Sequence, residues 1–150
     1  DVYKRQVLSL FGVSLMTGRF LVSGIKNLTA MGSKLIIYAS LLALISILLM
    51  IVARGPALGI IAVLLAGLAF APIFPTIVGV TFSKFDPGLY GSVLGVMFSI
   101  GLLGGTLIPK FIGNLSVGST VQQSLIIPAI MAAILLLVSL FVGRVGKTKA

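Results

Sequence analysis

Long stretches without a charged residue constrain this chain more than any other feature of its sequence. They cover residues 6–18, 35–53, 55–83, 87–109 and 111–143. A helix needs about 20 mainly apolar residues to cross the hydrocarbon core of a bilayer, because each residue advances it by about 1.5 Å. All but the first stretch reach that length alone, and the first reaches it once Arg19 is included in the helix. The pattern predicts a polytopic membrane protein.

The spans are predicted to be helices. Backbone polar groups in lipid must bond to one another, so a membrane-spanning chain forms helices or a closed barrel. Barrel strands alternate apolar and polar residues, whereas residues 41–45 read Leu, Leu, Ala, Leu, Ile. We therefore expect an all-α transmembrane helical bundle, the connections being too short to separate two domains. Its helices are predicted at residues 7–25, 35–52, 57–82, 91–113 and 123–143.

The two ends of the chain are interpreted separately from the bundle. Lys4 and Arg5 would lie on the outer side of the membrane, against the usual charge bias, so we interpret residues 1–6 as a truncation or assembly scar. Residues 144–150 carry several basic side chains and are predicted to form a cytoplasmic tail.

Composition argues against several classes of function. Charged residues make up 9% of the chain, hydrophobic residues 59%, and cysteine, histidine and glutamate are lacking. The sequence therefore offers no metal-binding cluster, no cofactor motif and no catalytic constellation, and we expect neither an enzyme nor a resident cofactor. The basic residues that give the net charge of +9 lie singly between apolar stretches and form no basic patch, so they do not suggest nucleic-acid binding.

The placement of lysine and arginine predicts the orientation of the bundle. Lys26, Lys34 and Lys84 would lie on one side, together with the basic tail, and Arg54 and Lys110 on the other. Basic residues in short connections favour the cytoplasm. We therefore expect a multi-pass protein of the cell (inner) membrane with its C-terminus in the cytoplasm.

The third predicted helix carries the motif that is most informative about function. Pro72 and Pro75 lie near the middle of the span, where each removes a backbone hydrogen bond. Broken helices of this kind often line the substrate path of transporters. Phe70 and Phe74 are four residues apart, which favours a shared face and makes both candidates for a substrate cavity. The alternative is a kinked helix with both rings in lipid or core.

The fourth predicted helix is rich in small residues at four-residue spacing, namely Gly91, Gly95 and Ser99, and again Gly101 and Gly105. Such stripes let helices pack closely, and a moving contact is a second use, so Gly101 and Gly105 join Pro72 and Pro75 as candidates for conformational change. Phe98 lies near mid-membrane and is a third cavity candidate, although a core or lipid position would also suit it.

Arg19 is the one charge well inside a predicted span. A charge in the membrane is costly and often functional. A conformational or loop-anchoring role is favoured over direct contact with substrate, and snorkelling to the nearby interface is the alternative.

The order of these features resembles the C-terminal half of the major facilitator superfamily. The residues that carry the resemblance are Gly18-Arg19-Phe20, the basic connection at 26–34, Phe74-Pro75-Thr76, Tyr90-Gly91-Ser92, residues 104–109, and Ile112-Gly113. Within the superfamily the chain looks most like the fucose/galactose/glucose–proton symporters. It departs from the superfamily in lacking an acidic residue in the 26–34 connection, so a gating ion pair there is not implied.

The resemblance implies twelve helices in two halves, with these five as the eighth to the twelfth. The expected partners are the lipid bilayer, the N-terminal half and the first helix of the C-terminal half, and a small solute with H⁺. The expected function is secondary transport of a small polar solute, a sugar by proton symport, through alternating access, with the coupling acids in the other half. Phe74 maps onto an aromatic position that can line the sugar cavity. The alternatives are another cargo, such as an organic anion or a drug, or a non-transporting scaffold or channel.

Overall fold

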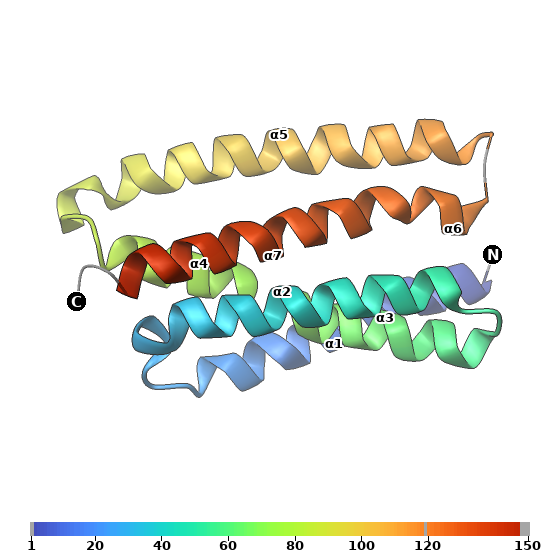
Figure 1. Ribbon diagram of the computed structural model, residues 1–150, viewed down its shortest axis with the longest axis horizontal. Coiled ribbons are helices and arrows are strands. Elements are labelled where there is room, and N and C mark those ends of the chain that lie inside the picture. The colour runs from blue at the N-terminus through green and yellow to red at the C-terminus, as the bar shows by residue number, and fades with distance from the viewer. Residues whose placement is uncertain (1, 119, 148–150) are drawn as a thin grey trace.

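The computed structural model describes residues 2–118 and 120–147, and within these ranges the regular structure is entirely helical. The helices are α1 (Val2–Ser23), α2 (Leu28–Val52), α3 (Pro56–Phe70), α4 (Ile73–Phe82), the short 3₁₀ helix η1 (Pro87–Leu89), α5 (Tyr90–Ser116), α6 (Val121–Ser124) and α7 (Ile126–Lys147). Figure 1 shows the long helices running roughly parallel or antiparallel to one another. The all-helical class is as the sequence predicts.

Five segments of the described chain are long and apolar enough to cross a bilayer. They are Arg5–Ser23, Ala30–Val52, Pro56–Phe82, Pro87–Ser116 and Gln122–Arg144. The third of these contains α3 and α4 together, so it forms one interrupted span. The expectation of five apolar helices is confirmed, and a location in a membrane is plausible on this basis.

The helices are arranged around α2. This helix packs against α3, α4 and α7, while α1 packs against α3 on the far side of the bundle (Figure 1). Helix α5 lies at the opposite edge, and none of its residues is buried. The described bundle therefore has one well-packed side and one long helix whose faces are largely open.

The interior is built from small residues and the surface from large apolar ones. The buried apolar residues are mostly alanines, and serines are buried beside them. Leucine, isoleucine, valine and phenylalanine side chains are exposed along every span. A protein in water would reverse this pattern, whereas a bundle in lipid gains nothing by hiding large apolar side chains and packs through small ones.

A buried hydrogen bond joins two helices of this interior. The hydroxyl groups of Ser40 in α2 and Ser139 in α7 lie 3.3 Å apart. Each hydroxyl also lies within hydrogen-bond distance of carbonyls of its own helix, so one serine donates across the interface while the other donates to its own helix and accepts. Interhelical bonds of this kind contribute roughly 0.6 kcal/mol in membrane bundles.

The helix boundaries differ from those predicted. The helix predicted at 57–82 is divided into α3 and α4, α1 ends at Ser23 rather than at residue 25, and α7 begins at Ile126 rather than at residue 123. Helix α2 begins at Leu28 rather than at residue 35, because Gly32, in the predicted 26–34 connection, lies inside the helix and packs closely against Val80 of α4. Helix α5 continues to Ser116, beyond the predicted end at residue 113.

The two ends of the chain are also helical where the structure describes them. Residues 2–6, set apart as a scar, belong to α1, and α7 extends through Lys147 into the segment predicted as a tail. The interpretation of residues 1–6 as a scar remains a prediction. Residues 148–150 of the predicted tail lie outside the described residues.

Consecutive spans alternate in direction, so the connections gather at two ends. Residues 24–27, residues 83–89 and the end of α7 lie at one end, and residues 53–55, 117, 118 and 120 lie at the other, where α1 also begins (Figure 1). The first end carries Lys26, Lys34, Lys84 and Arg144, and the second carries Arg5, Arg54 and Lys110. We expect the more basic end to face the cytoplasm.

Labelling of single cysteines in intact cells tests this orientation. The chain has no cysteine of its own, so each introduced thiol is the only target in it. With cysteine at Asn27, Gly55, Gly88 or Gly118, an impermeant maleimide should label positions 55 and 118 only. Positions 27 and 88 should react after the membrane is permeabilised. Labelling of position 88 in intact cells would show that the orientation is inverted.

Candidate functional site

The interruption in the third span is the centre of the candidate site. Helix α3 ends at Phe70 and α4 begins at Ile73, with Ala71 and Pro72 between them. Pro72 and Pro75 have no N–H, so the carbonyls four residues earlier, at Leu68 and Ala71, lose their helical donors. The backbone at Ala71 and Pro72 stays in the right-handed helical region, which makes the interruption local rather than an unwound segment. The break predicted from the two prolines is therefore present.

Helix α1 crosses the third span at this break. Gly18 is buried, and a Cβ atom placed on it would lie 2.5 Å from the Cβ of Ala71 and 3.4 Å from the Cα of Leu68. A second close approach one turn away brings Gly67 of α3 against Ser14 of α1. The residues of α1 thus cover the two positions whose carbonyls the prolines leave without donors.

The crossing places a cation beside the interrupted helix. A groove of about 210 Å³ is lined by Arg19, Val22 and Ser23 of α1 and by Phe74 and Pro75 of α4. Arg19 follows Gly18 directly, so the close contact at Gly18 fixes the depth at which the guanidinium-bearing residue meets α4. Three of the residues selected from the sequence, Arg19, Phe74 and Pro75, therefore line one groove.

The same part of α4 meets the edge helix α5. The ring centroids of Phe74 and Phe98 are 5.7 Å apart with a tilt of 54°. This geometry is within the range of favourable aromatic pairs. Both residues remain 45–49% exposed, so the two rings contact each other and still leave part of their surface uncovered. Two of the three predicted cavity aromatics are thus brought together by the fold.

Phe70 does not join this pair. It is the last residue of α3, and the interruption separates it from Phe74, so their four-residue spacing does not run along one continuous helix. Within residues 2–118 and 120–147, Phe70 forms no ring contact with Phe74 or Phe98. The shared face of Phe70 and Phe74 stays a prediction.

The glycines of α5 do not form the predicted close contact in the described part of the chain. Gly101 and Gly105 are exposed, and a Cβ atom at either would meet nothing within 4 Å. The tight contacts lie instead at Gly18, Gly32 and Gly67. A signal for them was present, because Ser14 and Gly18, and likewise Gly67 and Ala71, are small residues four apart.

Thr76 is a residue that the sequence analysis did not select. Its side chain is only 1% exposed, and its Oγ1 has no hydrogen-bond partner among the described residues. A threonine in a helix usually donates to the carbonyl four residues earlier, as Thr17 does to Val13, but the Thr76 hydroxyl does not. The Thr76 side chain packs toward Gly32 of α2, so the unsatisfied hydroxyl lies between α4 and α2.

Comparisons with known protein families, with curated proteins and with solved structures gave no match. The residues of the groove are therefore the guide to its chemistry. It combines a guanidinium, a serine hydroxyl and an aromatic ring beside a proline-broken helix. Such a site can bind a solute that has both polar groups and an apolar face.

Substitution at Gly18 tests the crossing that builds this site. Gly18→Ala adds a methyl group too close to that of Ala71, so the helices must separate, and overpacking of this kind costs about 1–3 kcal/mol. We expect a corresponding drop in the midpoint of thermal unfolding in detergent. The matched control is Gly12→Ala in the same helix, where the added Cβ would meet nothing within 4 Å and no loss is expected.

A compensating pair makes this test specific to the contact. Gly18→Ala combined with Ala71→Gly moves the methyl group to the other side of the interface, and stability should recover relative to either single variant. If Gly18→Ala were as stable as Gly12→Ala, α1 would not cross the third span at this point.

Proposed function

We propose that this chain forms part of the membrane domain of a secondary transporter for a small polar solute, a sugar carried by proton symport through alternating access. The observation that supports the proposal best is the meeting of Arg19, Phe74 and Pro75 in one groove at a proline-broken helix. Transporters place substrate sites at interrupted helices near the middle of the membrane.

The groups around the break suit a sugar. A sugar ring has a weakly polar face that stacks on an aromatic ring, and Phe74 offers such a surface because it is only half covered. The guanidinium of Arg19 carries five N–H donors, which match the hydroxyl oxygens of a sugar without requiring a charge on it. The Ser23 hydroxyl supplies a further polar contact at the same groove.

The open faces of α5 support the view that this bundle works with further helices. Its glycines are exposed and approach nothing in the described chain, although small residues at four-residue spacing serve close helix packing. The resemblance to the major facilitator superfamily supplies the missing partners, since it implies an N-terminal half and one further helix. The acids that couple transport to H⁺ would lie in that half.

An organic anion is a second candidate cargo, favoured by one observation. Arg19 lines the groove, and Asp86, the one acid among the described residues, does not. A guanidinium binds a carboxylate through two parallel hydrogen bonds, more strongly than it binds a neutral hydroxyl. The two cargoes are distinguished by uptake into proteoliposomes that contain the full-length protein.

The uptake experiment uses radiolabelled fucose, galactose and glucose, each with and without an inward proton gradient. The proposal expects one of these sugars to accumulate and a protonophore to abolish the accumulation. Accumulation of a carboxylate such as lactate, with no uptake of sugars, would replace the sugar by the organic anion. Absence of gradient-driven uptake of either class would contradict secondary transport of these solutes.

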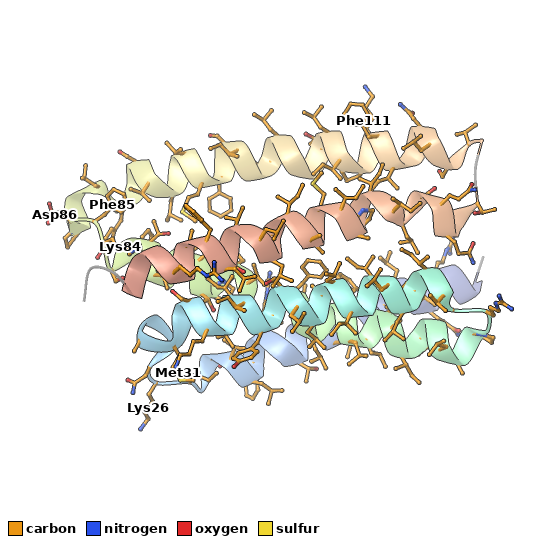
Figure 2. All side chains as sticks on the ribbon, in the orientation of Figure 1. Lys26, Met31, Lys84, Phe85, Asp86 and Phe111 are labelled. Carbon is orange, nitrogen blue, oxygen red and sulfur yellow. The ribbon has the colours of Figure 1, made fainter. Side chains whose placement is uncertain are left out.

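The role of the aromatic ring is tested by Phe74→Ala in the full-length protein. We expect a KM for the transported sugar raised about two- to tenfold, which corresponds to the loss of a ring contact of about 0.5–1.5 kcal/mol. Surface expression should be unchanged, since one ring alters the apolarity of a long span little. The control is Phe111→Ala, an exposed phenylalanine near the other end of α5 (Figure 2). An unchanged KM for Phe74→Ala would place the ring outside the cavity.

The role of Arg19 is tested by comparing Arg19→Lys with Arg19→Gln. If the groove binds a sugar through the forked geometry of the guanidinium, both variants should raise KM by about tenfold, because each loses that geometry. If it binds a carboxylate, Arg19→Lys keeps the charge but not the two parallel hydrogen bonds, so it should lose less affinity than Arg19→Gln, which loses both. Equal KM values for both variants and the parent would exclude contact between Arg19 and the solute.

A further inference from the structure

A second groove lies on the other side of α4, between α2, α4 and α7, and has a volume of about 340 Å³. Its walls are aliphatic and come from all three helices, including Ile36, Ile77 and Val138. It is half-open toward the outside of the bundle, where Val138 and Val142 are largely exposed. In a membrane, this groove would open to lipid.

The groove is charged at one end only, and its polar lining residue Ser139 is buried and hydrogen-bonded within the bundle. From Ile77 of α4 it extends past the end of that helix at Phe82, roughly 8 Å along the helix axis, to Lys84. Thr81 and Lys84 lie at the end nearest the 83–89 connection, and Ser33 joins them from the first turns of α2. Figure 2 shows Lys84 at this same end of the bundle, with Phe85 and Asp86. An amphiphile with one polar end would therefore have a defined direction in the groove.

The polar end of the groove is also basic. Lys84 is exposed, and no carboxylate lies within ion-pair distance of it in the part of the chain that the structure describes. Lys34 follows the lining residue Ser33 in α2 and is also exposed. Asp86, the one acid nearby in sequence, does not line the groove, so the charged group at its mouth is a cation.

We propose that this groove binds one anionic phospholipid, with its phosphate at Lys84 and the adjacent hydroxyls and one acyl chain along the aliphatic walls. The proposal rests on the bundle lying in a bilayer with its basic end at the cytoplasmic surface, and not on which solute is carried. Basic pockets between transmembrane helices on that side are suited to anionic headgroups.

The basic end and the aliphatic walls of the groove together favour an anionic phospholipid over other ligands. A soluble phosphate would use Lys84 but would leave the aliphatic walls exposed. A further protein helix would cover the walls but would bury the lysine without a counterion, which is costly. A zwitterionic lipid would fill the walls, but its own ammonium group competes with Lys84 for the phosphate. An anionic lipid satisfies both the charge and the apolar surface.

Native mass spectrometry of the purified full-length protein tests the proposal. The protein is mixed with equal amounts of phosphatidylglycerol and phosphatidylcholine that carry identical acyl chains. We expect phosphatidylglycerol to be retained preferentially and Lys84→Gln to reduce its retention about fivefold, the effect of one lysine near an anionic lipid surface. Lys110→Gln is the matched control, because Lys110 is an exposed lysine at the opposite end of the bundle.

Filling the groove tests the acyl-chain part separately. Val138→Phe places a ring in the half-open groove, and Leu135→Phe does so from the next turn of α7. Each should lower the retention of both lipids by a similar factor while the protein still elutes as a single species from size-exclusion chromatography. These measurements do not use transport, so they stand or fall independently of the proposed cargo.

Three results would overturn the proposal. Equal retention of the two lipids would remove the role of charge. Retention unaffected by Lys84→Gln would place the headgroup elsewhere. Loss on Lys84→Gln without any effect of Val138→Phe or Leu135→Phe would show that the lysine attracts anions at the surface and that no acyl chain occupies the groove.

Discussion

The close contact between α1 and the third span is the interaction on which the rest of the candidate site depends. In lipid, helices gain little by hiding large apolar side chains, so they are held by close packing and by interhelical hydrogen bonds. Gly18 and Gly67 provide that closeness, since a side chain at either would collide with the facing helix. The same contact sets Arg19 beside Pro75 and Phe74. A looser crossing would leave the arginine in lipid without a groove to line.

This contact also explains how the chain tolerates its proline pair. A carbonyl without a donor is costly in a membrane unless protein or water is near it. The two carbonyls concerned belong to Leu68 and Ala71, and these are the residues against which Gly18 packs. The residues that carry the hydrogen-bond deficit therefore belong to the helix–helix crossing. The unpartnered hydroxyl of Thr76 lies on another side of α4, where its side chain packs toward Gly32 of α2.

The features set by local chemistry could be predicted from the sequence, and those set by the neighbouring helix could not. The length of each apolar stretch determines where a helix can span the membrane, and the missing N–H of proline determines where a helix is interrupted. Both features can therefore be predicted from the sequence of this chain. Gly32 is different, because glycine followed by serine suggests a turn. Its position inside α2 depends on Val80 of α4, which the local sequence does not reveal. The four-residue spacing of Gly101 and Gly105 predicted a close helix contact that the described helices do not make. Such spacing indicates close packing but does not identify the partner helix. Phe98 was selected for its depth alone, and its pairing with Phe74 required the fold.

Helix α4 is the wall that the two grooves share. Phe74 and Pro75 line the groove toward α1, whereas Ile77, Val80, Thr81 and Lys84 line the groove toward α7. At about 100° per residue, the second set centres on a face roughly 120° from the first. Both grooves therefore depend on the position of this one short helix, which is joined to α3 through Ala71 and Pro72. If α4 has two positions in the transport cycle, a lipid on one face and a solute on the other are coupled through them, and by thermodynamic reciprocity each changes the affinity for the other by the same factor.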